Sequence, residues 1–265
     1  MSMRFTILGC GSSGGVPRVG NFWGACDPAN PKNRRRRCAL LVERFGKGGR
    51  TSVLVDTPAD LREQLLEARV EHLDAVLYTH DHADHIHGID DLRGIVFATK
   101  RRVPMYATPE TRAILMQRFD YCFSQPQGSL YPAILEAREL RPAEPLSIAG
   151  NGGPIEVTPV PQAHGSGTSL GFRFGNIAYS PDISGMPEAS VALLSGLEVW
   201  IVDALRHHPH PTHFSVRQAL DWIERLGAKR AILTHMTTEL DYDALRRKLP
   251  EHVEPGYDGM VVEID

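Results

Sequence analysis

Short apolar runs recur along the whole chain, separated by polar turns that are rich in glycine and proline. Runs of this length with this punctuation predict β-strands. We expect strands at residues 4–8, 38–44, 51–56, 75–78, 104–107, 155–160, 169–174, 176–180, 197–203, 230–233 and 261–264. The strands at 38–44 and 51–56 flank a glycine-rich turn and therefore predict a hairpin.

Helical periodicity occurs between several of these strands. A proline in the first turn of one segment and Gly227 after another mark helix ends. The predicted helices cover residues 58–69, 109–119, 214–226 and 242–249, with a short one that Asp90 or Asp91 caps and that ends at Ile95. Residues 120–150 show no clear period. The pattern predicts one α/β domain over residues 1–265, with two sheets inside and helices outside.

The densest cluster of polar side chains directly follows the predicted strand at residues 75–78. It contains His80, His82, Asp84 and His85. Alternation along an extended segment places the first three on one side, and His85 reaches out from the following turn. Such groups are costly to bury without a partner, and a divalent cation is the obvious one. The alternative is a solvated histidine-rich loop, which the preceding apolar strand disfavours.

Three further candidate ligands stand just after predicted strands. They are His164, Asp182 and His235. A single residue of this kind is commonly a turn or capping residue, but the tips of strands in layered α/β folds converge on one edge. With the His80 cluster they make seven ligands, too many for one tetrahedral ion and suited to two.

Composition narrows the class of protein. The net charge of −3 and a pI near 6.5 provide no basic field for nucleic acid. The four cysteines show no C-x-x-C spacing and predict reduced thiols of a cytoplasmic protein. We expect no signal peptide and no membrane association, because no basic leader or membrane-length apolar run occurs.

The ligand pattern resembles that of the metallo-β-lactamase-fold hydrolases. The resemblance is most specific at His80-x-His82-x-Asp84-His85, and the later His, Asp and His follow in the family's order. It implies a four-layer αβ/βα sandwich with two divalent ions, Zn²⁺ or Mn²⁺, that hold a bridging hydroxide. It implies one ion on His80, His82 and His164, a second on Asp84, His85 and His235, and Asp182 as the bridge.

Two further roles are implied by the same resemblance. Asp84 would also act in catalysis, and Asp56 would hold a ligand in position behind the metals. A helix cap before Pro58 is the alternative for Asp56. The glycine-rich loop around Ser12 and Ser13 could place backbone N–H groups against a substrate anion, or it could be a plain turn.

Phosphodiesterases of this fold carry an extra histidine between the bridging aspartate and the last ligand. His213 is the best match, because it directly precedes the predicted helix at 214–226. A cationic imidazole there could bind phosphate and protonate the leaving alkoxide. His207, His208 and His210 are better explained as solvated loop residues.

Both ends of the chain resemble the phosphoribosyl cyclic phosphate phosphodiesterases of the carbon–phosphorus lyase pathway. The similar segments are residues 8–17 and 256–260. Those enzymes hold a structural zinc through a cysteine cluster and a histidine. Here Cys26 alone remains in the matching loop, and Thr238 replaces the histidine, so we predict no structural zinc.

We therefore expect a dinuclear phosphodiesterase acting on a small cyclic phosphate or nucleotide-type diester. A tRNA 3′-processing endonuclease is the nearest rival, although its basic arm is missing and nucleic acid is not an expected partner. A thioesterase or an antibiotic hydrolase fits less well. A non-catalytic accessory protein of cofactor biosynthesis remains an alternative, as does a homodimer. The run of residues 34–37, all arginine, either attracts phosphate or is a solvated face.

Overall fold

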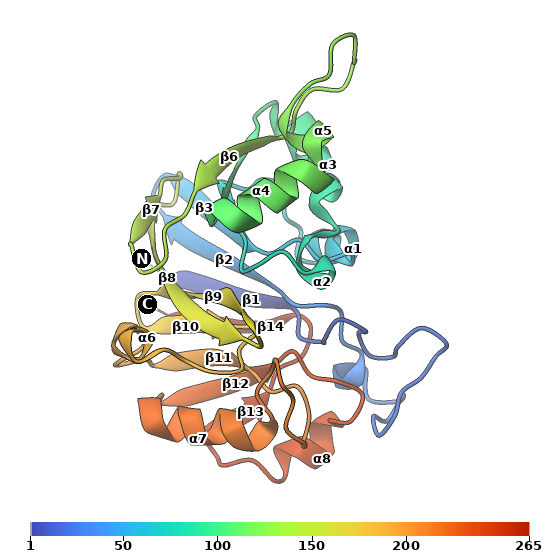
Figure 1. Ribbon diagram of the computed structural model, residues 1–265, viewed down its shortest axis with the longest axis vertical. Helices are drawn as coiled ribbons and strands as arrows, with labels where there is room; N and C mark the ends of the chain where they lie inside the picture. The colour runs from blue at the N-terminus through green and yellow to red at the C-terminus, as the bar shows by residue number, and fades with distance from the viewer. Residues whose placement is uncertain (1, 265) are drawn as a thin grey trace.

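Two seven-stranded sheets pack face to face, and helices cover their outer faces (Figure 1). This computed structural model describes residues 2–264. The first sheet has the order β14 (Met260–Ile264), β1 (Met3–Gly9), β2 (Ala39–Gly46), β3 (Gly49–Val55), β4 (Ala75–Leu77), β5 (Val103–Ala107), β6 (Leu135–Glu139). The second has the order β13 (Val253–Pro255), β12 (Arg230–Thr234), β11 (Val199–Asp203), β10 (Ile177–Ser180), β9 (Gly167–Phe174), β8 (Ile155–His164), β7 (Leu146–Ile148).

The helices divide between the two outer faces. The first sheet carries α1 (Leu61–Glu67), α2 (Ala83–Ile86), α3 (Leu92–Thr99), α4 (Pro109–Arg118) and α5 (Asp120–Phe123). The second carries α6 (Glu188–Leu193), α7 (Val216–Leu226) and α8 (Tyr242–Arg246). Single 3-10 turns occupy Pro31–Asn33 and Ile89–Asp91. The result is the four-layer αβ/βα sandwich that the sequence predicted.

Strands β2, β3 and β4 of the first sheet are buried on both faces over most of their length, which explains their continuous apolar runs. Along β2, Leu40 and Val42 enter the core between the sheets, where Phe172 also lies. Leu41, between them, enters the second core under the helices with Leu54. Alternate residues of one strand thus belong to two different cores, so no polar position interrupts the run.

Parallel pairing aligns the strand ends that carry the candidate ligands. Strands β3 to β6 run parallel to one another in the first sheet, and β10 to β13 do so in the second. Near this edge the two sheets are joined directly, since Leu170 N donates to Thr79 O at 3.0 Å. The segments after β4, β8, β10 and β12 therefore meet at one edge of the sandwich.

The predicted elements are largely present, with corrections at specific places. Residues 120–150, which showed no period, contain α5, β6 and β7. Neither α6 nor β13, both short, was predicted, and Asp84 and His85 lie in α2 where an extended segment and a turn were expected. The helix predicted at 58–69 begins at Leu61, and the one at 242–249 ends at Arg246. The helix predicted from 214 begins at Val216, because Ser215 caps it in a reciprocal pair with Gln218.

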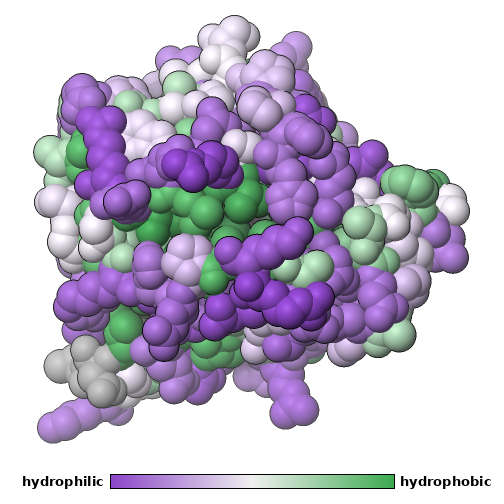
Figure 2. Space-filling model, turned by 90° about the horizontal axis from the view of Figure 1, so that it is seen from below, coloured by the Kyte–Doolittle hydropathy of each residue, from purple (hydrophilic) through white to green (hydrophobic). Residues whose placement is uncertain are grey.

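The side of the molecule formed by α7 and α8 is mostly hydrophilic, with one hydrophobic area enclosed by hydrophilic side chains (Figure 2). The hydrophilic surface agrees with α7, which buries its Val216, Ala219 and Ile223 against the second sheet. Among residues 2–264 no helix combines the length and the apolar character that crossing a bilayer would require.

Candidate metal centre

All seven ligands predicted from the sequence meet at the edge where the strand ends converge. Each is supplied by the segment that follows a strand or by the strand's last residue. The His80 cluster follows β4 and continues into α2, His164 ends β8, Asp182 follows β10, and His235 follows β12. Their ligand atoms form overlapping groups in which every atom lies within 4.8 Å of the others.

The first group contains His80, His82 and His164. His82 Nδ1 and His164 Nε2 are 3.3 Å apart. The opposite nitrogen of His164 donates to Thr212 O at 2.7 Å, so a neutral His164 presents an unprotonated Nε2 to the site. The unprotonated His164 Nε2 can accept a hydrogen bond from His82 Nδ1 or, where Nδ1 is unprotonated too, share a cation with it.

A hydrogen bond at Nδ1 also fixes the ring of His80. Its Nδ1 lies 2.9 Å from Thr79 Oγ1, and that hydroxyl donates to Asp56 Oδ2. Because the hydroxyl has a single proton, His80 Nδ1 must be the donor to it, and Nε2 is left as the lone pair that faces the site. Nε2 is buried and has no hydrogen-bond partner among residues 2–264.

The second group contains Asp84, His85 and His235. Asp84 Oδ2 lies 3.5 Å from His85 Nε2 and 3.5 Å from His235 Nε2. His85 Nδ1 donates to Asp56 Oδ2 at 2.7 Å, which turns Nε2 toward the site. Asp56 and His235 both have a positive φ, 65° and 56°. Such conformations in non-glycine residues persist where surrounding contacts enforce them.

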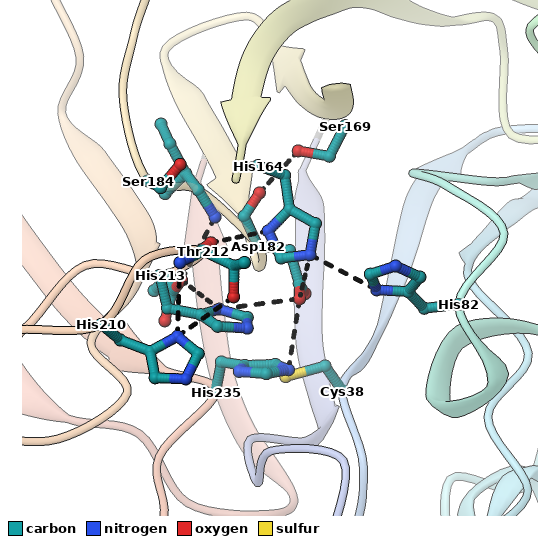
Figure 3. A network of polar contacts seen from close by, with 12 residues as sticks. Cys38, His82, His164, Ser169, Asp182, Ser184, His210, Thr212, His213 and His235 are labelled. Atoms are coloured by element: carbon teal, nitrogen blue, oxygen red, sulfur yellow. Dashed lines mark hydrogen bonds and ion pairs between the residues drawn. The ribbon is translucent and has the colours of Figure 1, made fainter. Parts of the chain in front are cut away.

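Asp182 lies between the two groups (Figure 3). Its Oδ2 is 2.9 Å from His85 Nε2, and its Oδ1 is 3.4 Å from His235 Nε2 and 3.8 Å from His164 Nε2. Two atoms that each bind one tetrahedral zinc at about 2.0–2.1 Å lie roughly 3.4 Å apart. The observed separations scatter around this value, with Asp182 Oδ1 near a ligand of each group and Oδ2 near His85.

The unpartnered atoms provide an independent test of whether these residues suit a metal. Among the described residues, His80 Nε2, His85 Nε2, His235 Nε2 and Asp182 Oδ2 are buried without a hydrogen bond of regular geometry, although His85 Nε2 and Asp182 Oδ2 form an ion pair at 2.9 Å. Leaving His80 Nε2 and His235 Nε2 unsatisfied costs free energy comparable to a lost hydrogen bond for each. All four face the same small space, so divalent cations fit this donor set.

The pKa shifts show where charge collects within the cluster. Burial opposes protonation of His235, but Asp182, Asp84 and Asp203 outweigh it and raise its pKa to about 9. The pKa of His85 is raised as well, since Asp182 and Asp56 outweigh its burial. In contrast, burial lowers the pKa of His80 and brings that of His164 to about 4. Protons on two of the histidines therefore balance the buried carboxylates of this protein when no cation does.

His213 adjoins the seven ligands and is held by Asp203, which the sequence analysis did not single out. His213 Nδ1 donates to Asp203 Oδ2 at 2.8 Å. Its ring stacks on His235 with centroids 4.6 Å apart and lies 4.8 Å from the His164 ring. Asp203 is the last residue of the apolar strand β11. The predicted ligands follow or end apolar strands in the same way, so this pattern could have identified Asp203 from the sequence.

His213 carries the positive charge expected from the sequence only when an anion lies next to it. Burial, reinforced by His235, lowers the pKa of His213 to about 4, although Asp182 opposes the shift. The imidazole is therefore neutral at neutral pH in the structure. A phosphate bound against the ring would raise the pKa again, because an opposite charge favours the cation.

The other loop histidines divide into two kinds. His207 and His208 are exposed, as expected for solvated residues. His210 is half-buried, and its ring centroid lies 5.4 Å from that of His213. Thr212 N donates to His210 Nδ1 at 3.3 Å, so a neutral His210 carries its proton on Nε2.

The N-terminal glycine-rich loop lies against the loop that carries His235. Ser12 is buried, and its N–H donates to Met236 O at 3.2 Å, whereas Ser13 is exposed. The role of Ser12 and Ser13 in binding substrate stays a prediction. Nearby, Cys26 donates to Thr238 O at 3.6 Å beside the buried Arg35, and the absence of a structural zinc also stays a prediction.

The arginine run holds the fold together at three of its four positions. Arg35 is 2% exposed and donates to Thr237 O, and Arg37 pairs with Asp60 at 3.0 Å. Arg36 pairs with Asp258 at 3.1 Å and also with Glu67. Arg34 alone among them is exposed, so the solvated-face interpretation applies to one residue. All four cysteines are buried and unpaired, as predicted for reduced thiols.

This sandwich and its edge of histidines and carboxylates define a metal-dependent hydrolase of the metallo-β-lactamase fold. The chain belongs to the beta-lactamase superfamily: the model described as "Beta-lactamase superfamily domain" matches residues 51–236.

Several known proteins are similar over almost the whole chain. A diphosphatase from the PhnP family is 36% identical, with a TM-score of 0.88 over 100% of this chain and 98% of its own. Zinc-bound PqqB from Methylobacterium extorquens is 17% identical, with a TM-score of 0.73 over 98% of this chain and 99% of its own. Human short-form tRNase Z is 19% identical, with a TM-score of 0.63 over 98% of both. The last two show the fold alone.

Among curated proteins, an octanoyltransferase from Porphyromonas gingivalis is 32% identical over 268 residues. The match covers 99% of this chain but 52% of that protein. The chain therefore spans about half the length of this relative.

Proposed function

We propose that this protein is a phosphodiesterase that hydrolyses a small cyclic phosphate or nucleotide-type diester with two divalent ions. The seven residues described above would hold the ions, Zn²⁺ or Mn²⁺. The observation that carries the proposal is the His213–Asp203 pair beside the ligand cluster, with its 2.8 Å hydrogen bond. A hydrolase that acts on amides or thioesters needs no such additional imidazole, whereas a phosphodiesterase gains a group that binds and protonates phosphate oxygens.

Bound divalent ions would supply Lewis-acid charge and activate water at neutral pH. The chain's own residues then orient the reaction. Burial opposes ionisation of Asp84, but His85 and His235 outweigh it and lower its pKa. Asp84 is thus an ionised carboxylate that can accept a hydrogen bond from the attacking water and fix its direction.

His213 would act on the opposite side of the reacting phosphate. Asp203 accepts a hydrogen bond from Nδ1–H, which fixes the ring and leaves Nε2 for the substrate. The anionic phosphate raises the pKa of the imidazole when it binds, so His213 gains a proton at the moment it is needed. That proton passes from Nε2 to the leaving alkoxide oxygen. His210 Nε2–H is a second donor on the same side.

The 36%-identical relative supports a reaction at phosphorus and suggests a second candidate substrate. That relative is a diphosphatase, so cleavage of a phosphoanhydride is the second candidate. Both reactions need the same in-line attack on phosphorus and the same charge at the site. They differ in the leaving group, which is a phosphate in an anhydride and needs less help from a proton donor than an alkoxide does.

The test is a substrate panel on protein loaded with Zn²⁺ or Mn²⁺. It contains bis-p-nitrophenyl phosphate, nucleoside cyclic phosphates, a dinucleoside diphosphate and an octanoyl thioester, the last because one relative is an octanoyltransferase. We expect metal-dependent release from the diesters, and His213→Ala should lower kcat by about 100- to 10,000-fold at normal metal content. Turnover of the thioester alone would overturn the proposal. Stoichiometric binding of diesters without turnover would favour an accessory role.

A further inference from the structure

A cavity of about 610 Å³ opens beside the first group of ligands. His82 and His164, which face each other across this side of the site (Figure 3), form one of its walls. The turn between β8 and β9 forms another wall, and the start of α4 forms a third. The volume lies within the range of sites for small molecules, so one half of a diester can enter it while its phosphate reaches the metals.

Hydroxyl groups make up most of the polar lining. They belong to Thr79, Thr108, Thr111, Ser166, Thr168, Ser169 and Thr212, of which Thr79 and Ser169 already donate within the protein. Ser166 and Thr168 are exposed in the turn between β8 and β9. Within residues 2–264 their hydroxyls make no hydrogen bond to another residue, so they are free to donate to and accept from a ligand. Thr108 accepts from Thr111 N at 3.3 Å and retains its own proton for a ligand.

Apart from the ions proposed at His82 and His164, the fixed charge of the residues that line this cavity is negative. Of the residues that line it, the acidic ones are Asp81 and Glu110, and lysine and arginine are absent from the lining. Asp81 lies 3.7 Å from Arg118, which offsets its charge. Glu110 is exposed and has no ion-pair partner within 4 Å among the described residues. A helix N-terminus attracts anions, but Glu110 in the first turn of α4 already supplies that negative charge.

From this lining we infer that the cavity receives the uncharged, hydroxyl-bearing half of the substrate and disfavours a second phosphate. The preferred class is then a diester of an unphosphorylated sugar or nucleoside. This inference rests on the proposed phosphodiesterase function. A phosphate in the cavity would lose its hydration without meeting a cation from the chain, and it would lie near the Glu110 carboxylate.

The test compares adenosine 2′,3′-cyclic phosphate with the same compound carrying a 5′-phosphate, on the metal-loaded enzyme. We expect kcat/KM to be at least about fivefold higher for the compound without the 5′-phosphate, as like charges in a partly solvated cleft imply. Glu110→Lys should reverse or abolish this preference, and Glu110→Gln should reduce it. The control is Glu251→Lys, an exposed glutamate outside the cavity, which should leave the preference unchanged.

Three results would overturn the inference. They are equal kcat/KM for the two compounds, a preference for the phosphorylated one, and no response to either Glu110 variant in protein with a normal melting temperature. Hydrolysis of bis-p-nitrophenyl phosphate in the same samples distinguishes failure of the cavity inference from failure of the proposed function. If it persists while the preference is missing, the cavity inference alone fails. If no diester is hydrolysed, the proposed function itself fails.

Discussion

His213 Nδ1 lies 2.8 Å from Asp203 Oδ2, and the two residues come from different sides of the loop that joins β11 to α7. Asp203 is fully buried, whereas His213 retains 9% of its exposure. The carboxylate therefore fixes the imidazole from inside the protein while the opposite ring nitrogen remains available to a ligand. An aspartate that orients a histidine in this way sets its tautomer as well as its position.

Replacing Asp203 with asparagine tests this arrangement. We expect kcat toward a diester to fall by about 10- to 100-fold while metal content stays normal, since such orienting partners typically contribute this much. Steady-state kinetics together with metal analysis give the readout. Asp221→Asn, on the exposed face of α7, is the matched control. Full activity in Asp203→Asn would show that His213 acts without it.

The ligand assignment predicts how metal content responds to single substitutions. We expect about two ions per chain in the wild type and about one in His82→Ala, because His82 belongs to one group of ligands only. Asp182→Ala should hold less metal than His82→Ala, since the two carboxylate oxygens of Asp182 face ligands of both groups. Elemental analysis after gel filtration measures this. The exposed His208→Ala is the control, and two retained ions in Asp182→Ala would refute the bridge.

The raised pKa of His235, about 9, makes metal binding depend on pH. Because a metal binds the neutral imidazole, a proton must leave His235 whenever the pH is below 9. Apparent affinity for Zn²⁺ should therefore rise with pH between 6.5 and 8.5, roughly tenfold per unit for each proton released. Competition with a chromophoric chelator at several pH values measures it. An affinity that is constant with pH would show that His235 is neutral before the metal binds.

The arginine run predicts a contrast in stability. Arg36→Ala removes hydrogen bonds to Asp258, which is largely buried, and should lower the free energy of unfolding by about 1–3 kcal/mol. The exposed Arg34→Ala should change it by less than about 0.5 kcal/mol. Denaturant titration gives both values. If Arg34→Ala instead lowers kcat/KM for a diester and leaves stability unchanged, the phosphate-attracting interpretation holds for that residue.

The strand pattern and the ligand set were readable from the sequence because both depend on local composition. An apolar strand such as β4 has to be buried, and the polar side chains that follow it have to find partners. The short elements between residues 120 and 150 were missed, because β6 and β7 lie at the edges of their sheets and carry few buried residues. Edge strands need less apolar sequence, so the signal is weak.

The sequence by itself determined which side chains would need a cation, since burial next to β4, β8, β10 and β12 follows from the strands that precede them. Only the tertiary structure decided what surrounds those side chains. The Asp203 contact to His213 and the hydroxyl-lined cavity both join residues far apart in the chain or on different elements. The physical reason is that hydrophobic periodicity reports on burial. The partner of a buried group depends on how the two sheets are packed together.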